Sequence, residues 1–410
     1  MGDEKEKGIR LLGLCLGPVD NQKAARIVSA AAELESWDSF LDLCRDRLAT
    51  PHVYASLKKA RAIDHISSDG QDRLKRSYLT NAAMNSLKLR QAMGLSEELE
   101  KAGFETLFIK GSSLVMGGHY PDPGYRPFSD VDLLVRGGSQ EKLEQIVTAM
   151  DGWKTMPPQQ MLEWETTPCM DKYGTHVDVH WRLKPFAGVS GDVPWERIWG
   201  GSGCVAYKGR EVRVPSPEDS YIHTAIHATA HHAFDSGIIF IAVADMNWLA
   251  VCENGLDWKK MASGLINEKL LAHAAVATLV AYNLTGEEKM KAGLDIFFEQ
   301  APEVRDICLP FTDAFMRMLY KPHVFRSMLE GQMFAKESRA VGFMFFARWV
   351  RRQIRNALRQ NNGYSGVEEH EIQNLFISPA YRKRIWDPDY MKYVFELYRF
   401  YKRLGFVTLE

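Results

Sequence analysis

Residues 107–136 constrain the fold more than any other part of the chain. A short apolar run at 107–109 predicts a buried strand. It is followed by the tight turn Lys110-Gly111-Ser112-Ser113 and by a segment, 113–120, that predicts one or two turns of helix. A small, glycine-containing turn at the start of a helix presents backbone N–H groups and the positive end of the helix dipole, which suit a phosphate. The segment therefore predicts a phosphate-binding turn.

Two aspartates follow this turn. Asp130 and Asp132 alternate with Val131 and lead into the apolar run Leu133-Leu134-Val135, which predicts a second strand. Residues two apart on a strand share a face, so both carboxylates should point the same way. Two adjacent like charges repel unless a cation neutralises them, and a divalent metal ion does so directly. We therefore expect a metal site opposite the phosphate-binding turn.

A third carboxylate lies on a later predicted strand. Residues 176–181 alternate polar and apolar, so His176, Asp178 and His180 should share one face while the intervening valines point to the core. Three carboxylates on neighbouring strands can hold two Mg²⁺ ions, or Mn²⁺ in their place, and clamp the attacking and leaving oxygens of a displacement.

This ordered set of elements resembles the nucleotidyltransferase superfamily of polymerase-β type. More narrowly, the chain is similar to a bacterial family of uncharacterised nucleotidyltransferase-like proteins. The resemblance rests on Lys110, Gly111, Ser112, Arg126, Asp130, Asp132 and Asp178, and less firmly on Pro215-Ser216-Pro217-Glu218-Asp219 and the histidine-rich helix after it. It implies a Mg²⁺-dependent enzyme that moves an NMP group from an NTP such as ATP to an acceptor hydroxyl on a small molecule, peptide or protein.

The resemblance also implies a role for each site residue. Catalysis and metal binding fall to Asp130, Asp132 and Asp178, with Asp178 also a candidate general base. Nucleotide binding falls to Lys110, Gly111, Ser112, Ser113 and Arg126. Simpler interpretations remain: Lys110 as a surface lysine at a strand end, and Arg126 in a structural ion pair with an aspartate of the site. Two further functions also remain open, a related phosphoryl transfer and a non-catalytic nucleotide-binding protein.

A histidine-rich helix should begin at Pro217, because Ser216 is a suitable N-cap and proline is favoured at the first helical position. His223, His227 and His231 follow at i, i+4 and i+8 on one helical face. Such spacing can bind a metal, but packed and hydrogen-bonded histidines are the simpler interpretation. We expect His227 to face inward, and name His176, His180 and His227 as candidates to face the catalytic cleft.

The overall pattern predicts an α+β fold in which a small mixed-sheet nucleotidyltransferase core is embedded in mostly helical regions. The expected divisions are a helical region (1–103), the core (104–185), a linker hairpin with a helical domain (186–320) and a basic helical region (321–410). In the first region, 72–102 predicts one long helix on which Lys88 belongs to a solvated face. In the last, 341–358 predicts a basic aromatic helix that we expect to dock on the protein.

Composition narrows the partners and the compartment. The formal net charge is −1, so nucleic acid is not the favoured acceptor, although an RNA-modifying role for the basic region remains an alternative. The six cysteines have no metal-ligand spacing. Residues 9–16 are too short and poorly flanked for a signal peptide, and no apolar run is long enough to predict a membrane span. We expect a cytoplasmic protein, and the oligomeric state is left open.

Overall fold

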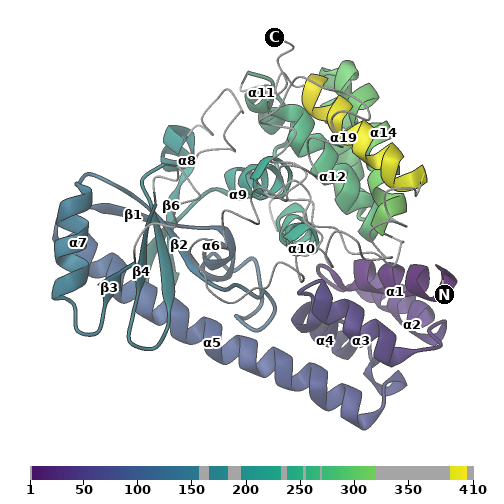
Figure 1. Ribbon diagram of the computed structural model, residues 1–410, viewed down its shortest axis with the longest axis horizontal. Coiled ribbons are helices and arrows are strands. Elements are labelled where there is room, and N and C mark those ends of the chain that lie inside the picture. The colour runs from purple at the N-terminus through teal and green to yellow at the C-terminus, as the bar shows by residue number, and fades with distance from the viewer. Residues whose placement is uncertain are drawn as a thin grey trace, which may run out of the picture.

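The computed structural model describes residues 2–156, 166–182, 195–231, 238–252, 255–267, 270–319 and 388–403. The fold is α+β as predicted, a mixed five-stranded sheet surrounded by many helices (Figure 1). The basic helix predicted over 341–358 lies outside the described residues.

The N-terminal part is helical, as predicted. Its elements are α1 (Gly2–Cys15), α2 (Asn21–Ala32), α3 (Trp37–Asp46), α4 (Thr50–Lys59), the short 3-10 helix η1 (Ile63–His65) and α5 (Ser68–Lys101). Helix α5 begins where the Ser67 side chain accepts a hydrogen bond from the Gly70 N–H group, a typical N-cap. In Figure 1 this long helix runs from the N-terminal helices to the sheet, so it connects the two regions.

The sheet has the order β1-β2-β5-β4-β3. Its strands are β1 (Glu105–Ile109), β2 (Val131–Arg136), β3 (Lys154–Thr155), β4 (Thr166–Met170) and β5 (His176–His180), and helix α7 (Gln140–Ala149) lies between β2 and β3 in the chain. Strands β2 and β5 are parallel, and every other neighbouring pair is antiparallel. The parallel pair matters for function, because it places the starts of β2 and β5 side by side.

Helices resume after the sheet. The chain forms α8 (Trp195–Gly201), the hairpin of β6 (Gly203–Tyr207) and β7 (Arg210–Val214), and α9 (Pro217–Ile226). The next elements are the π-helical turn η2 (His227–His231), α10 (Ile238–Ala250), α11 (Trp258–Asn267), α12 (Leu271–Thr285), α13 (Glu288–Gln300), α14 (Pro302–Leu319) and α19 (Pro388–Arg403). Ser216 caps α9 by accepting the Asp219 N–H, as predicted.

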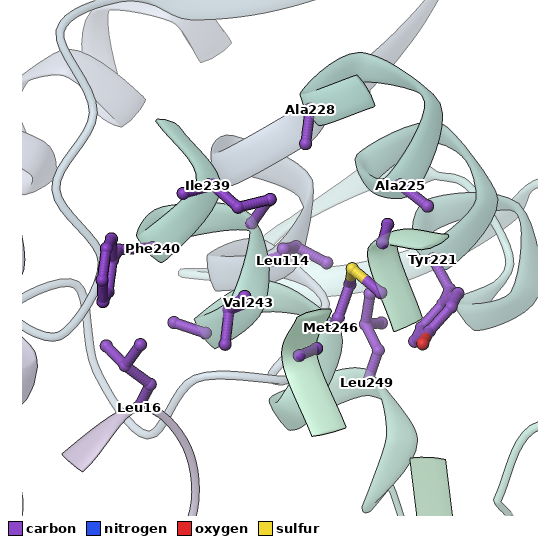
Figure 2. Close-up of a cluster of buried hydrophobic side chains, with 14 of the residues drawn as sticks. Leu16, Leu114, Tyr221, Ala225, Ala228, Ile239, Phe240, Val243, Met246 and Leu249 are labelled. Carbon is purple, nitrogen blue, oxygen red and sulfur yellow. The ribbon is translucent and has the colours of Figure 1, made fainter. Parts of the chain in front are cut away.

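Helix α10 occupies the centre of the helical part. Almost all of its residues are buried, which is the pattern of a helix enclosed by other elements. Figure 2 shows Val243, Met246 and Leu249 of α10 gathered with Leu114 and Tyr221, which come from the helices on either side. Asp245 of this helix is also buried, so a charged group lies among the apolar residues of α10. Among the described residues, no helix has both the length and the hydrophobicity to cross a membrane.

Candidate metal and nucleotide site

Three aspartates meet at one end of the parallel strand pair. Asp132 on β2 is the register partner of Asp178 on β5, and Asp130 immediately precedes β2. One carboxylate oxygen from each residue lies within 4.8 Å of the other two. Among the described residues, this is the one group of acidic, histidine or cysteine side chains close enough to share a metal ion. The structure thus brings together the three carboxylates that the alternating pattern indicated.

Asp132 already has two positively polarised neighbours. Its Oδ1 atom lies 2.6 Å from Nζ of Lys110 and 2.8 Å from Nε2 of His180. Only 7% of its side chain is exposed. Burial alone would raise the pKa of Asp132, but Lys110 and His180 outweigh burial and hold that pKa well below its ordinary value. Asp132 is therefore an anion at neutral pH.

Asp178 has the opposite environment. Burial raises the pKa of Asp178, and repulsion from Asp132 and Asp130 raises it further. A divalent cation between the three carboxylates would remove that repulsion, and carboxylate oxygens are the donors that Mg²⁺ and Mn²⁺ prefer. The donor set and its unrelieved repulsion therefore fit a divalent metal ion.

The predicted turn is in fact the first turn of a helix. Helix α6 (Lys110–Met116) begins directly after β1, so it starts three residues earlier than predicted and does not extend to Tyr120. The change of direction is made by Lys110 itself, which adopts a left-handed φ of +56°. The Ser112 and Ser113 hydroxyls donate to the carbonyls of Ile109 and Lys110 at 2.7 and 2.8 Å. Because these hydroxyl protons are engaged, the phosphate donors offered here are the backbone N–H groups.

Arg126 lies against this helical turn. A Cβ atom added to Gly111 would be 2.6 Å from Nη1 and 2.7 Å from Cζ of Arg126, so only glycine leaves room for the guanidinium group. Arg126 forms an ion pair with Asp245 of α10, with Nη2 at 2.9 Å from Oδ2. The ion pair anticipated as an alternative therefore exists, but its aspartate comes from a helix 119 residues away and not from the carboxylate group.

Four side chains of α5 hold the loop that carries Arg126 and leads to Asp130. They follow one face of the helix, and we call them the α5 clamp: Tyr78, Asn81, Asn85 and Lys88. Their hydrogen bonds reach the Asp122 carboxylate at 2.6 Å and the carbonyls of Gly124 at 2.9 Å, Pro123 at 2.8 Å, Arg126 at 2.7 Å and Phe128 at 2.7 Å. The interpretation of Lys88 as part of a solvated face is wrong, because it is half-buried and donates to Phe128 O.

The four candidate histidines differ in how far they are buried and in what they contact. His176 is exposed, whereas His180 is buried and bonded to Asp132. On α9, His223 is 9% exposed, and burial, reinforced by Lys110, lowers its pKa to about 3. His227 is half-buried and its ring lies 5.9 Å from that of His223. Helix α9 ends at Ile226, and residues 227–231 form a π-helical turn with a different number of residues per turn. The single histidine face predicted from the i, i+4, i+8 spacing therefore does not continue beyond α9.

Sequence reasoning missed three residues around the site. His223 was one of three equally spaced histidines, and the pattern gave no reason to prefer it. Tyr120 and Arg126 both donate to Asp245, which is a single charged residue in the apolar helix α10. A buried aspartate in a helix as apolar as α10 is the signal that could have identified Asp245, because buried carboxylates require a partner.

Comparison with known proteins agrees with this geometry. No curated protein and no solved structure is significantly similar to the chain. The sequence pattern of a family described as "Uncharacterised nucleotidyltransferase" matches residues 33–286, which is more than half of the chain and includes the three aspartates, the α6 turn and Asp245. The chain therefore belongs to this uncharacterised nucleotidyltransferase family.

Proposed function

We propose that the protein transfers a nucleoside monophosphate group from an NTP to an acceptor hydroxyl with the help of Mg²⁺. The observation that carries this proposal is the meeting of three carboxylates within 4.8 Å at the start of a parallel strand pair, beside a helical turn. Membership of a nucleotidyltransferase family supports nucleotidyl transfer in general.

The carboxylates are assigned to the metal. Asp130 and Asp132 would hold two ions between them, and Asp178 would complete the ion nearest the acceptor. Bound there, divalent cations neutralise phosphate charge and lower the pKa of a coordinated hydroxyl. Asp178 is also assigned as the general base for the acceptor hydroxyl.

The helical turn and two cations are assigned to the triphosphate. The N–H groups of Gly111 and Ser112, in the first turn of α6, have no partner within the helix and suit phosphate oxygens. Lys110 and Arg126 supply positive charge on either side of Gly111. Lys110 would exchange Asp132 for a phosphate when the cation arrives, because the cation then neutralises that carboxylate.

The transfer itself is a single displacement at phosphorus. The acceptor hydroxyl oxygen forms a bond to the α-phosphorus of the NTP, and the bond from that phosphorus to the β-phosphate oxygen breaks. Asp178 takes the hydroxyl proton, and pyrophosphate leaves with its charge held by the α6 turn. The chain's contribution is position and charge, which dominate catalysis in phosphoryl chemistry.

Labelled nucleotides test the proposal directly. The protein is incubated with Mg²⁺ or Mn²⁺, each of the four NTPs and separate pools of small molecules, peptides, proteins and RNA. Transfer of an α-phosphate label, with pyrophosphate release, is the expected result, and it should vanish in Asp130→Asn but persist in Asp151→Asn, an exposed aspartate outside the site. Transfer of a γ-phosphate label instead would indicate phosphoryl transfer. Binding of NTP with no transfer to any pool would indicate a non-catalytic binding protein.

A further inference from the structure

The guanidinium group of Arg126 has one edge occupied and one edge open. Nε and Nη2 donate to the Asp245 carboxylate, at 3.2 Å to Oδ1 and 2.9 Å to Oδ2, and Nη1 donates to Pro127 O at 2.8 Å. A guanidinium group has five N–H bonds. Two N–H bonds remain, one on Nη1 and one on Nη2, and we call these two donors the open edge of Arg126. No acceptor for them is found within the described part of the chain.

Asp245 cannot easily change its position. Its side chain is 3% exposed, and α10 is enclosed by the apolar contacts that Figure 2 shows on both sides of it. The Tyr120 hydroxyl donates to Asp245 Oδ1 at 2.6 Å, and Tyr120 is itself buried against Trp248 of the same helix. Asp245 is therefore held from two directions, and it fixes the side-on edge of Arg126 in turn.

The guanidinium group that carries this open edge lies next to the first turn of α6. The guanidinium packs on Gly111, and the neighbouring Lys110 is bonded to Asp132. Two N–H donors on one planar group can bind two oxygens of a phosphate, which the single ammonium group of lysine cannot do with the same fixed geometry.

We propose that Asp245 is a positioning residue which holds Arg126 so that its open edge binds a phosphate group of the nucleotide. This inference rests on the proposed function, and it adds a residue of α10 to the machinery of the α6 turn. Two roles for Asp245 are thereby distinguished: a purely structural ion pair stabilises the fold, whereas a positioning residue changes phosphate affinity through Arg126 alone.

A double-mutant cycle separates the two roles. Calorimetry measures the affinity of Mg²⁺–tripolyphosphate and Mg²⁺–ATP for the wild type, Asp245→Asn, Arg126→Gln and the double variant. Asp245→Asn should weaken tripolyphosphate binding by about 10- to 100-fold, the range expected for losing one charge-assisted contact. The double variant should bind no more weakly than Arg126→Gln, because Asp245 acts only through Arg126.

A matched control is the pair of Arg136 and Glu105, which is also bidentate, with both contacts at 2.8 Å. It joins the far end of β1 to β2, and Glu105→Gln should leave tripolyphosphate binding unchanged. Should Asp245→Asn fail to fold, as judged by its melting curve, Tyr120→Phe replaces it. That variant removes one hydrogen bond to Asp245, so it should weaken tripolyphosphate binding in the wild-type background and not in the Arg126→Gln background.

The results also separate this inference from the proposed function. If the wild type binds Mg²⁺–tripolyphosphate and Asp245→Asn or its substitute binds it equally well, the inference is wrong and the proposed function stands. Additive losses in the cycle would likewise overturn it, since they indicate independent roles. If the wild type binds neither tripolyphosphate nor any Mg²⁺–NTP, the proposed function and the inference fail together.

Discussion

Replacing Lys110 with methionine should make the protein bind a free divalent cation more tightly. In the structure, Nζ of Lys110 lies 2.6 Å from Oδ1 of Asp132, and the same oxygen accepts His180 at 2.8 Å. A cation that binds the carboxylates must compete with this ammonium group. Methionine keeps an unbranched side chain of similar length, so it suits the left-handed backbone at this position no worse than lysine does.

The size of the effect follows from the contact that is lost. A hydrogen bond between charged groups contributes about 1.5–3 kcal/mol net. The Lys110 side chain is only 21% exposed, so water screens this contact only partly. If cation binding must break the contact, its removal strengthens binding by up to the same free energy, which is about 10- to 100-fold in Kd.

Titration calorimetry of metal-stripped protein with Mn²⁺, without nucleotide, measures this change. Lys110→Met should bind Mn²⁺ more tightly than the wild type. It should lose affinity for Mn²⁺–NTP, because the ammonium group proposed to contact the triphosphate is gone. Lys142→Met is the control, since Lys142 donates to Ala102 O and not to the carboxylates, so its effect should be much smaller. Equal or weaker Mn²⁺ binding by a folded Lys110→Met variant would refute the reasoning.

Three further predictions concern the carboxylates and one buried histidine. Asp130→Asn should abolish metal-dependent nucleotide binding and leave the melting temperature equal or higher, because it relieves repulsion; calorimetry that finds wild-type affinity for Mg²⁺–ATP would place the site elsewhere. Asp178→Ala should lower the transfer rate by about 10²–10⁴-fold or more with little change in NTP affinity. A larger loss of transfer rate in His176→Ala or His180→Ala would indicate that a histidine, and not Asp178, is the general base. Burial and, secondarily, Arg126 lower the pKa of His52 from 6.5 to about 4, so only the unfolded chain takes up this proton as the pH falls through that window. Urea unfolding should show a loss of about 3 kcal/mol on reaching pH 4, which His52→Phe removes; an unchanged pH dependence in that variant would exclude His52 as its source.

The core of the site could be predicted from sequence because its signals are local. Alternation with period two fixes which residues of a strand share a face, so Asp178 and His180 could be placed together without any tertiary information. Their approach to Asp132 needed only the further expectation that the two strands are neighbours, which the parallel register of β2 and β5 confirms. The start of α6 was misplaced because a lysine with positive φ leaves no sequence signal of the kind that glycine leaves.

Contacts between distant segments could not be predicted in the same way. Arg126 was singled out for nucleotide binding, which stays a prediction, and nothing near it in the sequence indicates that Asp245 is its partner. Lys88 was misinterpreted for a related reason: a polar residue on a helix implies solvent unless a loop is known to cover that face. The loop from Asp122 to Phe128 covers it, and this contact is specified by the fold as a whole.

The α5 clamp limits how far the length of helix α5 can change. Helix α5 contains 34 residues, and its clamp residues contact the Arg126 loop from the same helix that packs on α4 through Tyr54 and Tyr78. One residue inserted between Tyr78 and Lys88 would rotate the later clamp residues by about 100° and move them by about 1.5 Å. Asn85 would then leave the loop while Tyr78 stayed on it. A substitution in α5 removes one clamp contact, whereas an insertion or deletion in this stretch would displace several at once, so we expect changes of chain length to be tolerated only in the connections outside it.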